Sequence, residues 1–121
     1  MALSSRRRAI LDWRYHRSRC RRSRRFDCSI FVNPGQEAVF EERTRKAVEF
    51  VRKAEPDTIY RLQRPTTNPS QYAFYEVYLS QAAFDRHVKE TLPALAKEVG
   101  PRPEGMLARP PDIEKLVPLG H

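Results

Sequence analysis

Residues 71–87, QYAFYEVYLSQAAFDRH, decide the fold, because a strand pattern changes into a helix pattern within this one stretch. Residues 72–79 are almost all aromatic, β-branched or apolar, which is typical of a strand that packs on both faces. Ser80 can cap a helix through its hydroxyl, and apolar residues then recur at helical spacing up to His87. We therefore predict a strand over residues 72–79 that runs directly into a helix.

The predicted strand has two different faces, because successive side chains of a strand point to opposite sides. One face carries Tyr72, Phe74, Glu76 and Tyr78. The other face carries Ala73, Tyr75, Val77 and Leu79. The single charge of the strand, Glu76, thus lies in an aromatic row, where it must find a partner or water.

The flanking sequence supplies the remaining elements of one domain. A strand over residues 26–32 ends at the turn Asn33-Pro34-Gly35, and an amphipathic helix over residues 36–54 is stopped by Pro56. A second strand over residues 58–64 is joined to residues 72–79 by a polar loop, which predicts a hairpin. Residues 91–93, Thr-Leu-Pro, interrupt the helix that begins at Ser80, and Thr91 can cap its last turns. A weak fourth strand follows over residues 112–117.

This order, β-α-β-β-α-β, predicts a ferredoxin-like α+β fold with an antiparallel sheet and two helices on one face. In so small a domain the opposite face of the sheet must also meet an apolar partner. Because residues 72–79 are aromatic on both faces, we expect that partner to be a second copy of the chain, so that the protein is a homodimer.

The charge of the chain is concentrated at its start. The 121 residues carry a formal charge of +8, but ten of the 23 basic residues and only one acidic residue, Asp12, lie in residues 1–25. Residues 26–121 carry −1. We predict a disordered basic extension over residues 1–25 and one folded domain over residues 26–121.

Three roles for the extension stay open: a solvated tail, a transit peptide, or a contact with nucleic acid or lipid. We expect a cytoplasmic protein, or a mitochondrial one if the extension is a transit peptide. We expect no nucleic-acid binding outside this extension, and no apolar run is long enough to span a membrane. Cys20 and Cys28 match no metal or redox spacing, so we expect reduced thiols.

Three segments resemble the antibiotic biosynthesis monooxygenase family: NPGQEAVFEER at residues 33–43, AEPDTIYRLQRP at residues 54–65 and NPSQYAFYEVYLSQAAFDRH at residues 68–87. Tyr75 and Glu76 match a Tyr-Glu pair of that family, and His87 falls on its helical histidine. Tyr78 stands where many members have Trp. Asp57 replaces a Gly that usually follows Glu-Pro, and residues 26–121 hold no Trp.

The resemblance implies a small dimeric protein of the kind that includes cofactor-independent quinol and anthrone oxygenases. Its substrate would be a phenol, a quinol or a related polyketide, which reacts with dioxygen without a metal or a flavin once it is ionised. His87 would be the general base, in a partly solvated site where its replacement costs little stability. The site residues implied are His87 and Tyr78 for catalysis, and Tyr60, Arg61, Phe74, Tyr75 and Glu76 for substrate binding.

Two alternatives remain at this stage. The chain could be a non-catalytic dimeric binding or stress-response module of the same fold, with His87 and the tyrosines serving structure alone. A closed apolar cavity of roughly 300 Å³ or more beside His87 would favour the enzyme. The second alternative is an RNA-recognition motif, whose signatures residues 30–32 and 72–74 resemble, although Gln71 stands where that motif requires Gly. The absence of Trp from residues 26–121 disfavours the haem-degrading branch of the superfamily.

Overall fold

Four strands form one antiparallel sheet in the computed structural model, which describes residues 23–119. The sheet order is β2-β3-β1-β4, from β1 (Arg24–Phe31), β2 (Ile59–Gln63), β3 (Gln71–Tyr78) and β4 (Asp112–Leu116). Helix α2 (Glu37–Ala54) joins β1 to β2, and α3 (Gln81–Arg86), the π-helical turn η1 (His87–Thr91) and α4 (Leu92–Val99) follow β3. The ferredoxin-like order is therefore confirmed.

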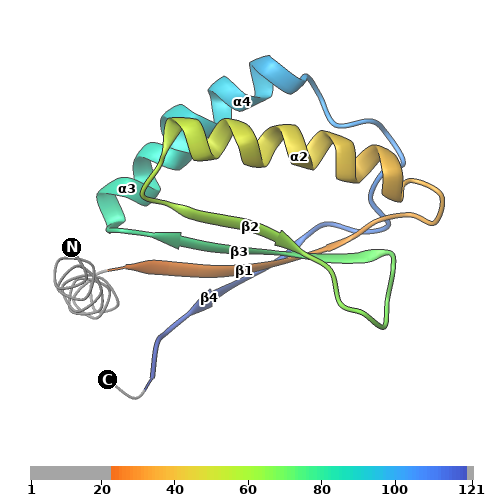
Figure 1. Ribbon diagram of the computed structural model, residues 1–121, viewed down its shortest axis with the longest axis horizontal. Helices are drawn as coiled ribbons and strands as arrows, with labels where there is room; N and C mark the ends of the chain where they lie inside the picture. Colours follow the sequence, from red (N-terminus) through yellow and green to blue (C-terminus); the bar gives the residue numbers. More distant parts are fainter. Residues whose placement is uncertain (1–22, 120–121) are drawn as a thin grey trace, which may run out of the picture.

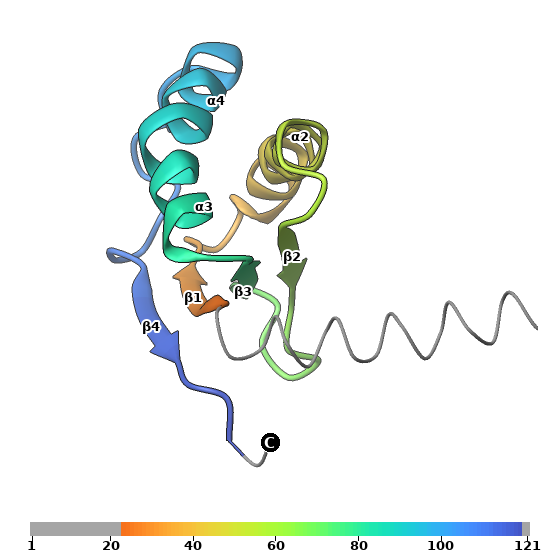
Figure 2. The same cartoon turned by 90° about the vertical axis from the view of Figure 1, so that its left-hand side faces the viewer.

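Helices α2, α3 and α4 and the turn η1 lie on one side of the sheet (Figures 1 and 2). The side chains of Tyr72 and Tyr78 are 1% and 0% exposed, so the predicted aromatic row of β3 faces the helices. Phe40 of α2 packs on Tyr72 with ring centroids 4.6 Å apart, and the Tyr72 hydroxyl donates to Glu41 Oε1 over 2.9 Å. The core is thus the layer between α2, α4 and this face of the sheet.

Strand β1 begins at Arg24, so it includes the last two residues of the predicted extension. Arg24 is the register partner of Tyr78, and Arg25 is the partner of Val77. The rest of the extension, residues 1–22 with Cys20, lies outside the described residues. No helix within residues 23–119 is both long and apolar enough to cross a membrane.

The predicted interruption at residues 91–93 takes the form of a wide turn rather than a break. Pro93 has no N–H to donate, and its ring would collide with the carbonyl of Lys89 in a regular α-helix. In η1 the N–H of Leu92 bonds instead to the carbonyl of His87, five residues back. Ser80 caps α3 as predicted, since its hydroxyl accepts from the N–H of Ala83, whereas the Thr91 side chain makes no cap.

A loop of residues 100–111 returns the chain from α4 to β4 along the end of the helical layer (Figure 1). Asn33, in the predicted turn after β1, anchors this loop by donating from Nδ2 to the carbonyls of Gly105 and Leu107 over 2.7 and 3.1 Å. Met106, 1% exposed, fills the core from the same loop. The loop is therefore held against the end of the cleft described below.

Candidate active site

His87 is buried and bonded to a carboxylate. Its Nδ1 lies 2.7 Å from Oε2 of Glu55, the residue that ends α2, and both side chains are 3% exposed. The expectation of a partly solvated histidine is therefore wrong, because η1 turns His87 inward, toward the end of α2. Nε2 makes no hydrogen bond to any residue between 23 and 119.

Glu55 is held by three side-chain donors. Thr58 Oγ1 donates to Oε1 over 2.9 Å, and Thr91 bonds the same carboxylate from the other end of η1. Burial alone would raise the pKa of Glu55, but the hydrogen bonds from Thr91, His87 and Thr58 outweigh it, and the pKa lies below its usual value. Glu55 is thus an anion, so His87 Nδ1 donates to it and Nε2 is left to accept a proton.

Two tyrosines enclose the imidazole. The His87 ring centroid lies 4.8 Å from that of Tyr78 and 5.7 Å from that of Tyr60. The Tyr78 hydroxyl donates to Glu76 Oε1 over 2.5 Å. Burial, together with the negative charge of Glu76, raises the pKa of both Tyr60 and Tyr78 well above the usual value. Both phenols are therefore neutral donors at any physiological pH.

Glu76 is the second carboxylate near His87. It lies in the middle of the sheet, where its register partners are Phe26 on β1 and Tyr60 on β2. Burial raises its pKa, the Tyr78 hydrogen bond and the His87 charge oppose that rise, and the charge of Glu55 adds to it. The two carboxylates thus differ, since Glu55 stays ionised while Glu76 is shifted toward its neutral form.

A half-open cleft of about 380 Å³ lies between α2 and α4 above the sheet. Tyr60 and Phe74 of the sheet, Phe40 and Ala47 of α2, and Leu92 and Leu95 of α4 contribute to its lining. His87 is not part of the lining. Tyr60 is next to both, because it lines the cleft and its ring centroid lies 5.7 Å from that of His87.

The structure brings together five of the seven predicted site residues, which are Tyr60, Phe74, Glu76, Tyr78 and His87. Arg61 and Tyr75 are register partners on the opposite face of the sheet, so they cannot line the same cleft. Tyr75 accepts there from Arg25 Nη1 over 3.4 Å, and Arg61 is exposed.

The predicted set lacks Glu55, Thr58 and Thr91. One signal in the sequence points to Glu55, because an acidic residue at the carboxyl end of a helix opposes the helix dipole and needs another reason to be there. Nothing comparable marks the two threonines.

The residues that the structure describes offer neither a metal site nor a reactive thiol. Within residues 23–119 no group of three or more His, Cys, Asp or Glu side chains could hold a metal ion. Cys28 is a buried free thiol, and burial, followed by the nearby charges of Glu76 and Asp27, raises its pKa to about 11. A thiol of that pKa is not a nucleophile at neutral pH.

Comparisons with known proteins agree with this fold. The profile of a family described as antibiotic biosynthesis monooxygenase matches residues 28–92. A solved structure from Caulobacter crescentus, described as a candidate antibiotic biosynthesis monooxygenase, is 26% identical with a TM-score of 0.66, and the match covers 81% of this chain and 91% of that one. No curated protein matches the chain.

Two further structures share the fold. A Pseudomonas aeruginosa protein has a TM-score of 0.63 at 20% identity, with 82% of this chain and 96% of that one covered. A candidate monooxygenase from Lactobacillus acidophilus has a TM-score of 0.64 at 24% identity, and the match covers 78% of this chain but only 44% of that longer one. None of these comparisons supports the RNA-recognition alternative.

The raised pKa of Glu76 predicts a pH-dependent stability. The folded protein binds this proton at a higher pH than the unfolded chain does, so protonation of Glu76 stabilises the fold. We expect Glu76→Gln to unfold at a higher urea concentration than the wild type at pH 7.5, and this difference to shrink as the pH falls toward 4.5, the ordinary value. Glu98→Gln, on an exposed residue of α4, controls for the lost charge. A difference that stays constant with pH would contradict the assignment.

Proposed function

Because the chain belongs to the antibiotic biosynthesis monooxygenase family, we propose that it is a cofactor-independent monooxygenase that oxidises a phenolic, quinol or polyketide-type aromatic substrate with dioxygen. The observation that carries this proposal is the buried Glu55–His87 pair, in which Nδ1 is bonded and Nε2 is not. Within residues 23–119 Nε2 is not one of the fully enclosed polar atoms that lack a partner, so it keeps accessible surface to which a substrate hydroxyl would donate.

In the proposed reaction His87 Nε2 accepts the proton of the substrate hydroxyl, and Glu55 stabilises the resulting imidazolium. The Tyr60 hydroxyl makes no hydrogen bond to a described residue, so it is available to donate to the substrate oxygen as charge develops there. Because His87 does not line the cleft whereas the neighbouring Tyr60 does, the proposal requires the Tyr60 side chain to move when substrate enters.

The oxidation balances without a metal or an external reductant. The substrate anion passes one electron to dioxygen, and the two radicals then combine into a hydroperoxide on carbon. For an anthrone-type methylene, one oxygen atom remains as the new carbonyl, and the other leaves as water with the two methylene hydrogens. The apolar part of the cleft lining supports this chemistry, because it would shield the ring of the substrate from water on that side.

A second candidate function is supported by the position of Tyr60. Since His87 is not part of the cleft lining, an aromatic molecule could bind in the cleft without reaching the base. The protein would then be a non-catalytic binding module of the same fold.

His87 variants separate these two functions, provided that stability is controlled. Removing the partner of a buried charge such as the Glu55 carboxylate costs about 3–5 kcal/mol, so His87→Ala alone could inactivate the protein by unfolding it. We therefore compare His87→Asn with the double variant Glu55→Gln/His87→Asn, in which no buried charge is left unpaired. We expect both to oxidise a panel of quinols and anthrones on the order of a hundredfold to ten-thousandfold more slowly than the wild type.

The melting temperature of the double variant should lie closer to that of the wild type than that of His87→Asn does. A double variant that folds and keeps full activity would make His87 a structural residue. A wild-type protein that binds members of the panel, but oxidises none without added metal or flavin, would favour the binding module.

We also propose that a second copy covers the open side of the sheet and the C-terminal segment. Ile113, Val117 and Leu119 are 68%, 74% and 88% exposed, which is unusual for three large apolar residues within one short segment. Tyr75 and Val77 lie on the face of β3 that no described helix covers. A homodimer would bury both regions.

Sedimentation at micromolar concentration tests the dimer. We expect the wild type to sediment as a dimer and Ile113→Lys/Val117→Lys as a folded monomer. Val39→Lys/Val88→Lys is the matched control, because these valines are 50% and 45% exposed but lie in the helical layer. A monomeric wild type, or a control pair that dissociates equally, would contradict the proposed interface.

A further inference from the structure

The cleft between α2 and α4 combines apolar walls with two guanidinium groups and no acid. Among the residues that line it, the charged side chains are Arg43 and Arg102, and neither Asp nor Glu is present. A cleft that served a neutral aromatic molecule would need no cation in its wall. An uncompensated positive charge at an apolar site instead favours a ligand that carries an anion.

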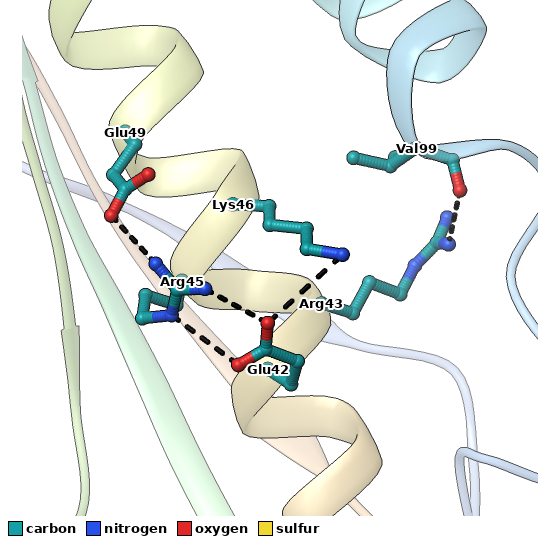
Figure 3. A network of polar contacts seen from close by, with 6 residues as sticks. All are labelled: Glu42, Arg43, Arg45, Lys46, Glu49 and Val99. Carbon is teal, nitrogen blue, oxygen red and sulfur yellow. Dashed lines mark hydrogen bonds and ion pairs between the residues drawn. The ribbon is translucent and has the colours of Figure 1, made fainter.

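Arg43 belongs to the frame of the cleft. Figure 3 shows its side chain reaching from α2 toward α4, where Nη1 donates to the carbonyl of Val99 over 3.0 Å. Nη2 donates to the carbonyl of Gly100 over 2.7 Å. These bonds occupy carbonyls at the carboxyl end of α4 and connect the two helices. Arg43 therefore adds positive charge to the wall of the cleft, but its side chain has little freedom to move toward a ligand.

Arg102 differs from Arg43 because it is exposed and makes no hydrogen bond or ion pair to any described residue. Its backbone is nevertheless constrained. Gly100 turns the chain out of α4 with a positive φ of 73°, and Pro101 and Pro103 restrict the positions on either side of Arg102. Arg102 is thus a free guanidinium on a stiff segment beside the apolar cleft, and its side chain can bind a carboxylate with two parallel hydrogen bonds.

From these observations we infer that the cleft binds a planar aromatic carboxylate, with its rings between Phe40, Phe74 and Leu95 and its carboxylate on Arg102. The volume of about 380 Å³ lies near the lower end of the range for ligand clefts, which suits a compact ring system. The inference rests on the proposed function in one respect only, since it names the substrate class of the proposed oxygenase. Binding can be measured without turnover.

The test is a fluorescence titration of the full chain with two probes that differ by one group, 1-hydroxy-2-naphthoate and 1-naphthol. We expect the wild type to bind the carboxylate more tightly than the naphthol. Arg102→Gln should weaken carboxylate binding roughly tenfold, as expected for the loss of a charged pair, and leave naphthol binding unchanged. Arg52→Gln, an exposed arginine of α2 outside this cleft, controls for the net charge and should change neither affinity.

Ala96→Trp locates the ligand. Ala96 lines the cleft from α4 but is exposed, so a larger side chain there fills the cleft without entering the core. We expect it to abolish binding of both probes while leaving the melting temperature near that of the wild type. The inference fails if Arg102→Gln weakens both probes equally, if Ala96→Trp leaves binding intact, or if neither probe binds. A protein that binds the carboxylate as expected but oxidises nothing would overturn the proposed oxygenase and keep this inference.

Discussion

The buried contact between Glu55 and His87 is the interaction on which the candidate site depends. It joins the end of α2 to the turn that follows α3, so it links the two halves of the helical layer across 32 residues of sequence. Transfer of the Glu55 carboxylate into the interior is costly, and that cost is offset only when donors satisfy its lone pairs. Thr58 and Thr91 supply those hydrogen bonds here. The π-helical turn makes this possible, because it presents both His87 and Thr91 inward.

The electrostatics of the site follow from two carboxylates in unlike surroundings. Glu55 has three side-chain donors and a lowered pKa, whereas Glu76 has one, from Tyr78, and a raised pKa. The charge of Glu55 also raises the pKa of Glu76. An anion that fixes the imidazole, beside a carboxyl group whose pKa is shifted upward, is the kind of division that acid–base chemistry uses. It arises here from burial, hydrogen bonds and nearby charges.

Much of the fold could be predicted from the sequence, because local signals agree with one another. The change from strand to helix at Ser80, the turn at Asn33-Pro34-Gly35 and the stop at Pro56 fix the element order. The site was less predictable. The family resemblance implies Tyr75 and Arg61 as site residues, although strand alternation places Tyr75 on the other face from Tyr78 and Arg61 on the other face from Tyr60. The partnership of Glu55 with His87 depends on how α2 packs against η1, which no periodicity in the sequence specifies.

The central claim is that Glu55 fixes His87 with Nδ1 protonated and Nε2 free to accept a proton. Nitrogen NMR of the imidazole in the wild-type protein tests it most directly, because the two ring nitrogens give separate signals for each tautomer. When the ring is neutral, we expect the proton on Nδ1, and a loss of this preference in Glu55→Gln. A neutral ring with its proton on Nε2 in the wild type would contradict the account, since the carboxylate would then not orient the base.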